Sequence, residues 1–455
     1  MKYDVLVVGG GPAGIITSVT ARKVHGPGLK IGLFRPESKT LVPCGIPYMF
    51  GTLDAVDKNI MPDKPLEAAK VDIIQDEVVS LDLEAKTLKT ASGSEYSFDK
   101  LVLATGSEPV VPSGLPGTDL DNVFTIRKSY AYLTEVHRRL ADCRDIVIIG
   151  GGFIGAEMAD ELARREDRNI TLIEIMDHCL WQSFDPEFCE MGEKALAEKG
   201  VKVLTGTKVL GITGDRRVEA VETSAGRFKA DAVVLAIGAR PNTALAAEAG
   251  LRLTPRGAVA VDSGMRTSHP DVLAVGDCAA KTDFFSGEES PVMLASVATI
   301  EARTAGANLY SVKAMLPGGS TPGAFSTVVG GLALGSAGLT ETEARRRGID
   351  VTVGLGESVD RHPGTLPGAS PIKVKLVFST MSGELLGGQV AGGAGVGEMV
   401  NVIALAVGRR MEATDLYLMP LGTHPLLTSA PTTYPVVTAA WDYLGRVLTA
   451  PSRGH

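Results

Sequence analysis

Cysteine, aromatic residues and long apolar runs are all scarce in this sequence. Five cysteines in 455 residues, at 44, 143, 179, 189 and 278, are too few and too scattered for a disulfide framework. No CxxC or HxxxH spacing indicates a metal site, and no apolar stretch approaches the roughly 18 residues that a membrane span needs. The N-terminus reads as a strand and a turn, not as a signal peptide. We therefore expect a cytoplasmic protein with no metal and no membrane partner.

An excess of basic charge is also lacking. Lysine and arginine number 45 against 53 aspartates and glutamates, for a net charge of −8. A nucleic acid partner is therefore not expected. Hydrophobic residues make up 44% of the chain, which excludes a disordered one.

Glycine is what the sequence has in excess. It occupies 53 of 455 positions, about 12%, where about 7% is average. No Gly-X-Y period runs through the chain, which excludes collagen. The backbone must therefore bend sharply, or approach something closely, at many places.

Two of these glycine clusters form an internal repeat. The apolar run Tyr3 to Val8 ends in Gly9-Gly10-Gly11-Pro12-Ala13-Gly14, and Ile146 to Ile149 ends in Gly150-Gly151-Gly152-Phe153-Ile154-Gly155. Each has the GxGxxG spacing after a strand and before a helix, and each is followed by a second short strand. In this motif the first glycine turns the chain, the second lets a pyrophosphate approach, and the third packs helix on strand. Two dinucleotide-binding units are predicted.

Further patterns complete the domain organisation. Buried strands ending in glycine recur at 101–106 and 233–238, a helix is predicted over 294–309, and a Pro/Gly-rich stretch at 316–323 indicates a linker. The segment after it mixes strands and helices. We predict an α/β fold with two Rossmann-like domains and a C-terminal α+β domain, over residues 1–112 with 247–323, 113–246 and 324–455.

The second strand of each unit should end in a carboxylate that holds the ribose hydroxyls. Glu174 fits in the second unit, and no arginine cluster beside it would receive a 2′-phosphate, so NADH is favoured over NADPH there. In the first unit Arg35 stands at the matching place, and Glu37 lies two residues further on.

Cys44 has an unusual setting in Val42-Pro43-Cys44-Gly45-Ile46-Pro47-Tyr48. Its prolines and glycine indicate a rigid turn leading into a helix, whose dipole would lower the pKa of the thiol and favour the thiolate. The other four cysteines have no such context and are interpreted as structural.

These residues together resemble the flavin-dependent pyridine nucleotide-disulfide oxidoreductases. The resemblance covers almost the whole chain, in family order. The motifs that carry it are Gly9 to Gly14, Ala104-Thr105-Gly106, Gly150 to Gly155, Ala239 to Thr243, and Thr267 to Ala279 with its Gly276-Asp277 pair. It implies FAD on the first unit, NADH or NADPH on the second, and a C-terminal domain that pairs two subunits into a homodimer.

The resemblance also assigns sites residue by residue. For FAD it implies Gly9, Gly11, Pro12, Ala13, Gly14, Val78, Ala104, Thr105, Gly106, Asp277 and Ala295. For the nicotinamide nucleotide it implies Gly150, Gly152, Phe153, Ile154, Gly155, Glu174 and Gly238. Val78 would lie against the adenine, Asp277 at the ribityl or pyrophosphate end, and Ala295 near the isoalloxazine.

Position 49 is methionine, so the CxxxxC redox disulfide of two-cysteine members is absent. The chain resembles the single-cysteine branch, which includes coenzyme A disulfide and persulfide reductases, NADH oxidases and NADH peroxidases. Since it stops at His455, we expect no added rhodanese domain. Cys44 would be the redox cysteine, and Arg22 and Lys23 would bind coenzyme A phosphates.

Near the C-terminus this chain departs from the coenzyme A reductases. They often have a Tyr-Ala-Pro-Pro segment there, where this chain has Leu418 to Pro425. Thr423-His424-Pro425 is instead similar to the His-Pro of two-cysteine reductases, in which the histidine acts as acid and base, so His424 is a catalytic candidate.

The expected reaction passes electrons from NAD(P)H through FAD and Cys44 to a disulfide or persulfide, with coenzyme A as the expected carrier. One alternative is an NADH oxidase or peroxidase that works through a Cys44 sulfenic acid. A second is an electron-transfer reductase for a protein acceptor, and a third a non-catalytic NADH-sensing flavoprotein.

Overall fold

The computed structural model describes residues 1–316 and 319–449. Pro317 and Gly318 of the predicted linker and the last six residues of the predicted third domain lie outside them. The chain divides into two compact units. Unit 1 comprises Met1–Gly114, Asn122–Cys143 and Val234–Thr321, and unit 2 comprises Leu115–Asp121, Arg144–Val233 and Pro322–His455.

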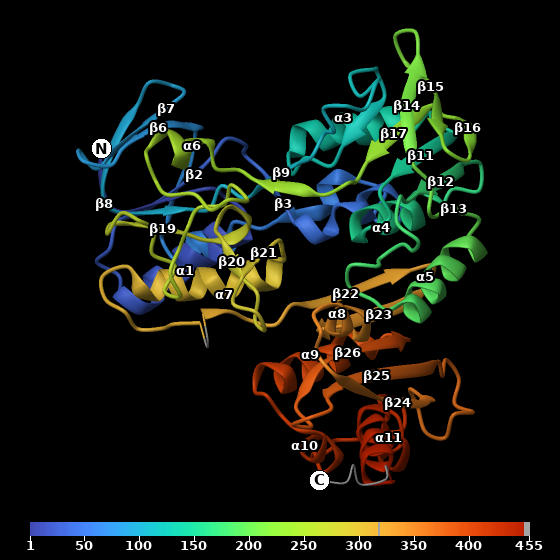
Figure 1. Ribbon diagram of the computed structural model, residues 1–455. Coiled ribbons are helices and arrows are strands. Elements are labelled where there is room, and N and C mark those ends of the chain that lie inside the picture. The colour runs from blue at the N-terminus through green and yellow to red at the C-terminus, as the bar shows by residue number, and fades with distance from the viewer. Residues whose placement is uncertain (317–318, 450–455) are drawn as a thin grey trace. The chain divides into compact units, whose positions relative to one another are not determined.

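Unit 1 is built on a seven-stranded sheet whose strands run in the order β5-β2-β1-β8-β7-β6, with β19 beside β8. The pairs β1–β2, β1–β8, β2–β5 and β8–β19 are parallel, whereas β6, β7 and β8 pair antiparallel. Helices α1 and α7 lie side by side in this unit (Figure 1). The bounds are β1 Lys2–Val8, α1 Pro12–His25, β2 Ile31–Arg35, β5 Asp72–Gln75, β6 Val78–Asp82, β7 Thr87–Thr90, β8 Glu95–Leu103, β19 Val272–Ala274 and α7 Ala295–Asn308.

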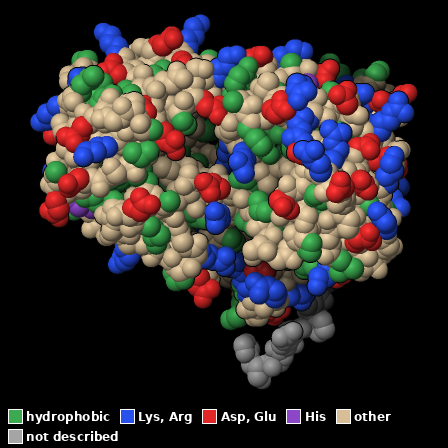
Figure 2. Space-filling model, turned by 90° about the horizontal axis from the view of Figure 1, so that it is seen from above, with side chains coloured by type: hydrophobic (Ala, Val, Ile, Leu, Met, Phe, Trp, Pro, Cys, Tyr) green, Lys and Arg blue, Asp and Glu red, His purple; other side chains and the backbone are tan. Residues whose placement is uncertain are grey.

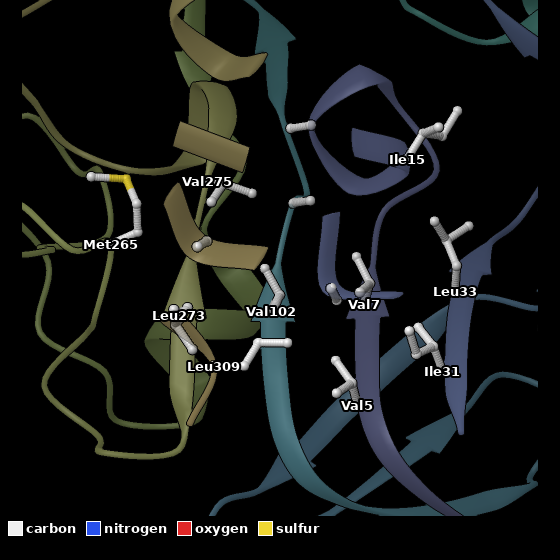
Figure 3. Close-up of a cluster of buried hydrophobic side chains, with 14 of the residues drawn as sticks. Val5, Val7, Ile15, Ile31, Leu33, Val102, Met265, Leu273, Val275 and Leu309 are labelled. Atoms are coloured by element: carbon white, nitrogen blue, oxygen red, sulfur yellow. The ribbon is translucent and has the colours of Figure 1, made fainter. Parts of the chain in front are cut away.

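The apolar run of β1 arises because both faces of this sheet are buried. Val5 and Val7 belong to one core cluster, and the alternate residues Leu6 and Val8 belong to another. Side chains of a strand point alternately to opposite faces, so a strand buried on both sides is apolar throughout. Figure 3 shows the first cluster, with Val5, Val7, Ile31, Leu33, Val102 and Leu273 from neighbouring strands and Ile15 from α1.

Unit 2 repeats the strand–glycine turn–helix pattern. Its strands β11 (Asp145–Ile149), β12 (Asn169–Ile173) and β13 (Lys202–Leu204) are parallel, with α4 (Phe153–Leu162) after β11 and α5 (Pro186–Glu198) before β13. An antiparallel meander follows, formed by β14 (Val209–Gly214), β15 (Val218–Thr223) and β16 (Gly226–Lys229).

The C-terminal part of unit 2 is a five-stranded antiparallel sheet in the order β22-β23-β26-β25-β24. Helix α9 contacts β22, β23 and β26, and α11 contacts β24 and β25. The bounds are β22 Ala324–Val329, β23 Leu332–Gly338, α8 Glu341–Arg346, β24 Val351–Val359, β25 Pro371–Ser379, β26 Leu385–Gly392, α9 Val396–Gly408, α10 Ala413–Tyr417 and α11 Pro435–Thr449. The predicted α+β character of this segment is confirmed.

The two units also contain shorter helices and strands. They are β3 Thr40–Leu41, β4 Ile60–Met61, α2 Lys64–Ala68, β9 Ser107–Pro109, β10 Val123–Thr125, α3 Tyr130–Leu140, β17 Ala232–Leu235, β18 Ala239–Pro241, α6 Ala244–Glu248, β20 Lys281–Thr282 and β21 Glu289–Ser290. On the face seen in Figure 2, acidic and basic side chains are interspersed.

A buried ionic cluster joins α5 to the C-terminal sheet within unit 2. The Lys375 ammonium lies 3.0 Å from Asp185, 2.7 Å from Glu187 and 2.7 Å from Glu341, with its side chain only 6% exposed. Asp185, the N-cap residue of α5, also accepts hydrogen bonds from Gln389 and Thr342. Burial alone would raise the pKa of Asp185, but these hydrogen bonds and the charge of Lys375 lower it.

Lys375→Met should therefore destabilise the protein strongly, because it leaves the Asp185 carboxylate buried without its counter-charge. We expect the free energy of unfolding to fall by about 3–5 kcal/mol, measured by urea unfolding. Lys194→Met is the matched control, since Lys194 forms an exposed pair with Glu198 on the same helix and should change stability by less than about 1 kcal/mol. Equal losses in the two variants would contradict this account of the cluster.

Candidate functional site

The first glycine loop has three glycines with three different requirements. Gly9 has a φ of +121°, and a Cβ on it would stand 2.1 Å from the Ala104 carbonyl oxygen. A Cβ on Gly14 would stand 1.9 Å from the Gly9 carbonyl oxygen. Gly11 is the N-cap of α1, and a Cβ there would meet no described atom within 4 Å.

This open helix N-terminus fits a dinucleotide phosphate. The first turn of α1 contains no acidic residue, and no side chain caps it. Free backbone N–H groups at a helix N-terminus, together with the helix dipole, favour an anion. Pro12 and Ala13 begin that helix, so the residues assigned to FAD from Gly9 to Gly14 form one continuous strand–turn–helix element.

The second glycine loop has the same geometry and a carboxylate already bound to it. Gly150 has a φ of +106°, and Gly152 is the N-cap of α4 with open space at its Cβ position. Glu174, the residue after β12, is buried, and its two oxygens accept hydrogen bonds from the backbone amides of Gly151 (2.6 Å) and Met176 (2.8 Å). The structure thus places Glu174 against the loop, and its predicted contact with the ribose hydroxyls stays a prediction.

Three other residues assigned to the nicotinamide nucleotide lie on α4. Phe153 begins this helix and stacks on Phe325 at a ring distance of 5.5 Å, Ile154 is exposed, and Gly155 is buried. Gly238, which has a φ of +107°, follows β17 and belongs to unit 1.

Asp277 lies in a polar cluster in unit 1. Its Oδ2 accepts hydrogen bonds from Ser107 Oγ (2.7 Å) and Lys128 Nζ (2.8 Å). Burial would raise the pKa of Asp277, but the Lys128 charge and these hydrogen bonds hold it below its ordinary value. Lys128 lies 149 positions from Asp277 along the chain.

A buried ion pair supports the same turn from behind. The Gly276 amide donates to Glu301 Oε2 (2.8 Å), and Lys281 Nζ donates to the Gly276 carbonyl (2.6 Å) while lying 3.1 Å from Glu301 Oε1. Both side chains are almost fully buried. The conformation of the Gly276–Asp277 turn is therefore held by charges that no local sequence motif indicates.

The remaining residues assigned to FAD also lie in unit 1. Thr105, just after β8, donates its hydroxyl to the Asn242 carbonyl at 2.6 Å, and Gly106 beside it has a φ of +71°. Val78 begins β6 and packs at the edge of a core cluster. Ala295 is the first residue of α7.

Cys44 is exposed, whereas Cys143, Cys179, Cys189 and Cys278 are buried. The expectation that its turn leads into a helix with a useful dipole is wrong in part. Cys44 lies inside a three-residue 3₁₀ helix, Pro43–Gly45, followed by another of four residues, Pro47–Phe50. These helices are short because the prolines remove N–H donors and restrict the residues before them.

The turn that carries Cys44 is rigid for a different reason. A Cβ on Gly45 would stand 1.9 Å from the Asn59 side-chain oxygen, and Asn59 Nδ2 donates to the Val42 carbonyl at 3.0 Å. The Asn59 amide therefore fits against the backbone on both sides of Cys44. Sequence reasoning did not identify Asn59, which is 17 positions from Val42.

His424 is exposed in unit 2, and its ring Nδ1 accepts a hydrogen bond from the Leu426 amide at 3.3 Å. With Nδ1 as the acceptor, a neutral ring carries its proton on Nε2, which is then the donor.

Of the two basic candidates, Arg22 is engaged with the protein backbone. Its guanidinium donates to the carbonyls of Ala69, Gly26 and Lys70, at the C-terminal ends of α1 and α2. This is a structural arrangement, because helix C-termini favour a cation. Lys23 is exposed.

The comparisons with known proteins agree with this arrangement. Residues 3–302 match the model of the pyridine nucleotide-disulphide oxidoreductases, and residues 324–435 match the dimerisation domain of the same family. The chain belongs to this family. Its fold is therefore two Rossmann-like domains with a C-terminal dimerisation domain, and its cofactors are FAD and a reduced pyridine nucleotide.

Relatives within the family are named for different activities. An NADH oxidase of Methanocaldococcus jannaschii is 31% identical over 90% of this chain and 92% of its own. An NAD(P)H coenzyme A polysulfide/persulfide reductase of Pyrococcus horikoshii is 33% identical over 86% of this chain and 88% of its own. The structure of an NAD-dependent persulfide reductase from A. fulgidus superimposes with a TM-score of 0.89 at 29% identity, over 98% of this chain and 83% of its own.

The described residues include neither a candidate membrane-spanning helix nor a candidate metal site. No helix in 1–316 and 319–449 has the length and hydropathy to cross a membrane. No group of three or more His, Cys, Asp or Glu side chains in those ranges could hold a metal ion.

Glu157 on α4 provides a test of the site's electrostatics. Burial raises its pKa to about 7, although Thr327 Oγ1 donates to its carboxylate at 2.7 Å. A carboxyl group whose pKa is raised in the folded state lowers stability as pH rises from the unfolded pKa of about 4.3 to the folded one. Glu157→Gln should therefore gain up to about 3 kcal/mol relative to the unmutated protein at pH 8, and less than about 1 kcal/mol at pH 4.5, in urea unfolding at both values. The same difference in free energy of unfolding between the two proteins at both pH values would contradict a raised pKa at Glu157.

Proposed function

We propose that this flavoprotein NAD(P)H oxidoreductase passes electrons through Cys44 to the sulfur of a small disulfide or persulfide, with coenzyme A as the carrier. The observation that carries the proposal is the exposure of Cys44 on a rigid turn, while the other four cysteines are buried. A thiol that attacks an external substrate must be accessible. The Pyrococcus horikoshii relative, which has a sulfur acceptor in its name, supports the same reading.

The cofactor sites follow from the two glycine loops. We propose that Gly9 to Gly14, Ala104 to Gly106, Val78, Asp277 and Ala295 hold FAD, and that Gly150 to Gly155, Gly238 and Glu174 hold the nicotinamide nucleotide. NADH is the proposed donor, because none of the four residues after Glu174 is a lysine or arginine that would bind a 2′-phosphate. The domain boundaries proposed for this arrangement are those predicted from the sequence.

The chemistry at Cys44 is a thiol–disulfide exchange. The Cys44 thiolate attacks one sulfur of the substrate, the substrate S–S bond breaks, and a thiolate leaves from a disulfide, or hydrogen sulfide from a persulfide. FAD, when bound and reduced by NADH, would supply the two electrons that break the resulting mixed disulfide. Cys44 then returns to its thiolate form, and the second substrate thiolate leaves. We propose that His424, whose Nε2 carries the proton, protonates a departing thiolate, and that the protein acts as a homodimer.

Cys44→Ser tests the sulfur route. We expect turnover of NADH with coenzyme A disulfide or persulfide to fall at least about 100-fold, because the serine hydroxyl does not exchange with disulfides. Anaerobic stopped-flow reduction of the bound flavin by NADH should stay within about twofold of the unmutated rate. Cys143→Ser is the matched control, a buried cysteine whose loss should leave both rates unchanged. Full turnover by Cys44→Ser with these substrates would overturn the proposal.

The second candidate function is reduction of oxygen or peroxide through a Cys44 sulfenic acid, which the Methanocaldococcus jannaschii relative supports. The two candidates differ in acceptor. NADH oxidation at full rate in air, with no acceleration by coenzyme A disulfide or persulfide, would establish the second and exclude the first.

His424→Gln tests the proton donor. A leaving thiolate of high pKa needs a proton, whereas an aromatic thiolate of low pKa leaves without one. We expect kcat with an alkyl disulfide such as coenzyme A disulfide to fall about 100-fold, and kcat with an aromatic disulfide to change by less than threefold. Equal losses with the two substrates would show that His424 is not the acid.

A further inference from the structure

The end of β2 in unit 1 differs from a usual dinucleotide site, because Arg35 stands where a ribose-binding carboxylate is expected. The Arg35 side chain is only 8% exposed. A Cβ on Gly10, in the middle of the first glycine loop, would stand 2.8 Å from Arg35 Cβ and 3.0 Å from its Cδ, the atom that bears Nε. The Arg35 side chain thus packs directly against the first glycine loop.

Four of the five N–H donors of this guanidinium are used within the protein. Nη1 and Nη2 bind the two oxygens of Asp63, at 2.6 and 2.7 Å, as a bidentate pair. The second hydrogens of Nη1 and Nη2 go to the Thr40 hydroxyl (3.4 Å) and the Ser38 carbonyl (2.8 Å). The fifth donor, Nε, is buried and has no hydrogen-bond partner among the described residues.

Glu37, the acidic residue nearest to Arg35 along the chain, does not replace the missing ribose-binding carboxylate. Glu37 Oε1 accepts a hydrogen bond from the Ser129 hydroxyl, and its Oε2 accepts from the Tyr130 amide at 2.7 Å. Glu37 therefore caps the N-terminus of α3. Asp63, for its part, has both oxygens on Arg35.

The unpaired donor points to a particular ligand atom. Buried N–H groups in proteins are almost always paired, so an exception at a binding loop calls for an acceptor that the ligand brings. A phosphate would not be favoured, because Asp63 already neutralises the guanidinium. A neutral oxygen fits, and the ribose at this strand end offers its 2′ and 3′ hydroxyls.

We propose that Arg35 Nε donates a hydrogen bond to an adenosine ribose hydroxyl of FAD, so that the protein is the donor where a carboxylate would have been the acceptor. The two residues then have different roles. Asp63 orients the guanidinium, and Arg35 Nε contacts the ligand. This inference rests on the proposed binding of FAD at the first glycine loop, and does not depend on the acceptor or on Cys44.

The test measures dissociation constants of the full-length apoprotein for FAD and for analogues lacking the adenosine 2′ or 3′ hydroxyl, by quenching of flavin fluorescence. The unmutated protein should bind one of the two analogues about tenfold or more weakly than FAD, since a hydrogen bond to a charged group is lost. Arg35→Lys should bind FAD about tenfold more weakly, and should show no further loss with that analogue. Arg266→Lys is the matched control, an exposed arginine paired with Asp262 in the same unit, and should behave as the unmutated protein.

Other outcomes overturn the proposal. An equal factor of loss for Arg35→Lys with FAD and both analogues would show a purely structural arginine. If Asp63→Asn removes the difference in affinity between FAD and the analogue, and Arg35→Lys retains that difference, the ribose hydroxyl binds Asp63 instead. If Arg35→Lys fails to fold, equal affinity of the unmutated protein for FAD and both analogues overturns it.

Gly11→Val separates this inference from the cofactor assignment. Its side chain would extend into the open space at the α1 N-terminus, so FAD binding should be lost while the fold is kept. If this variant binds FAD normally, the assignment of FAD to the first loop fails, whatever Arg35 does.

Discussion

The close approach of backbone to backbone at the first glycine loop is the constraint on which unit 1 depends. A Cβ on Gly9 or on Gly14 would overlap a carbonyl oxygen, at 2.1 and 1.9 Å, so the turn exists only because both positions lack a side chain. That turn brings the N-terminus of α1 to the carboxyl end of β1, with no side-chain hydrogen bond capping the helix. The loop after β11 makes the corresponding turn into α4, with a positive φ at Gly150 and open space at the Cβ position of Gly152.

Around these two glycine loops, buried charged side chains form hydrogen bonds to backbone groups. Glu174 binds the amide of Gly151, and Glu301 with Lys281 binds the amide and carbonyl of Gly276. A buried charge is tolerated only when it is paired and hydrogen-bonded. In each case the charged group holds the backbone of a glycine turn in one conformation.

Cys44, the proposed redox cysteine, is held by other contacts. Short 3₁₀ turns with prolines, and the amide of Asn59 packed against Gly45, hold Cys44 at the surface. A thiol on such a turn is accessible to a substrate without a large movement of the chain. Relatives of this chain are named for different acceptors, an NADH oxidase and a coenzyme A polysulfide/persulfide reductase, so membership of the family does not by itself decide the acceptor.

Local features were determined by the sequence alone. The two glycine loops and their flanking strands and helices follow from short-range patterns, because φ preferences, side-chain alternation and GxGxxG spacing act within a few residues. The family and its cofactors follow from the resemblance that these motifs carry. The helix expected over 294–309 was found at Ala295–Asn308 for the same reason. What only the tertiary structure decided are the partners of charged side chains. Asp63 pairs with Arg35 across 28 positions and Lys128 with Asp277 across 149, and no periodicity links residues so far apart until the folded chain brings them into contact.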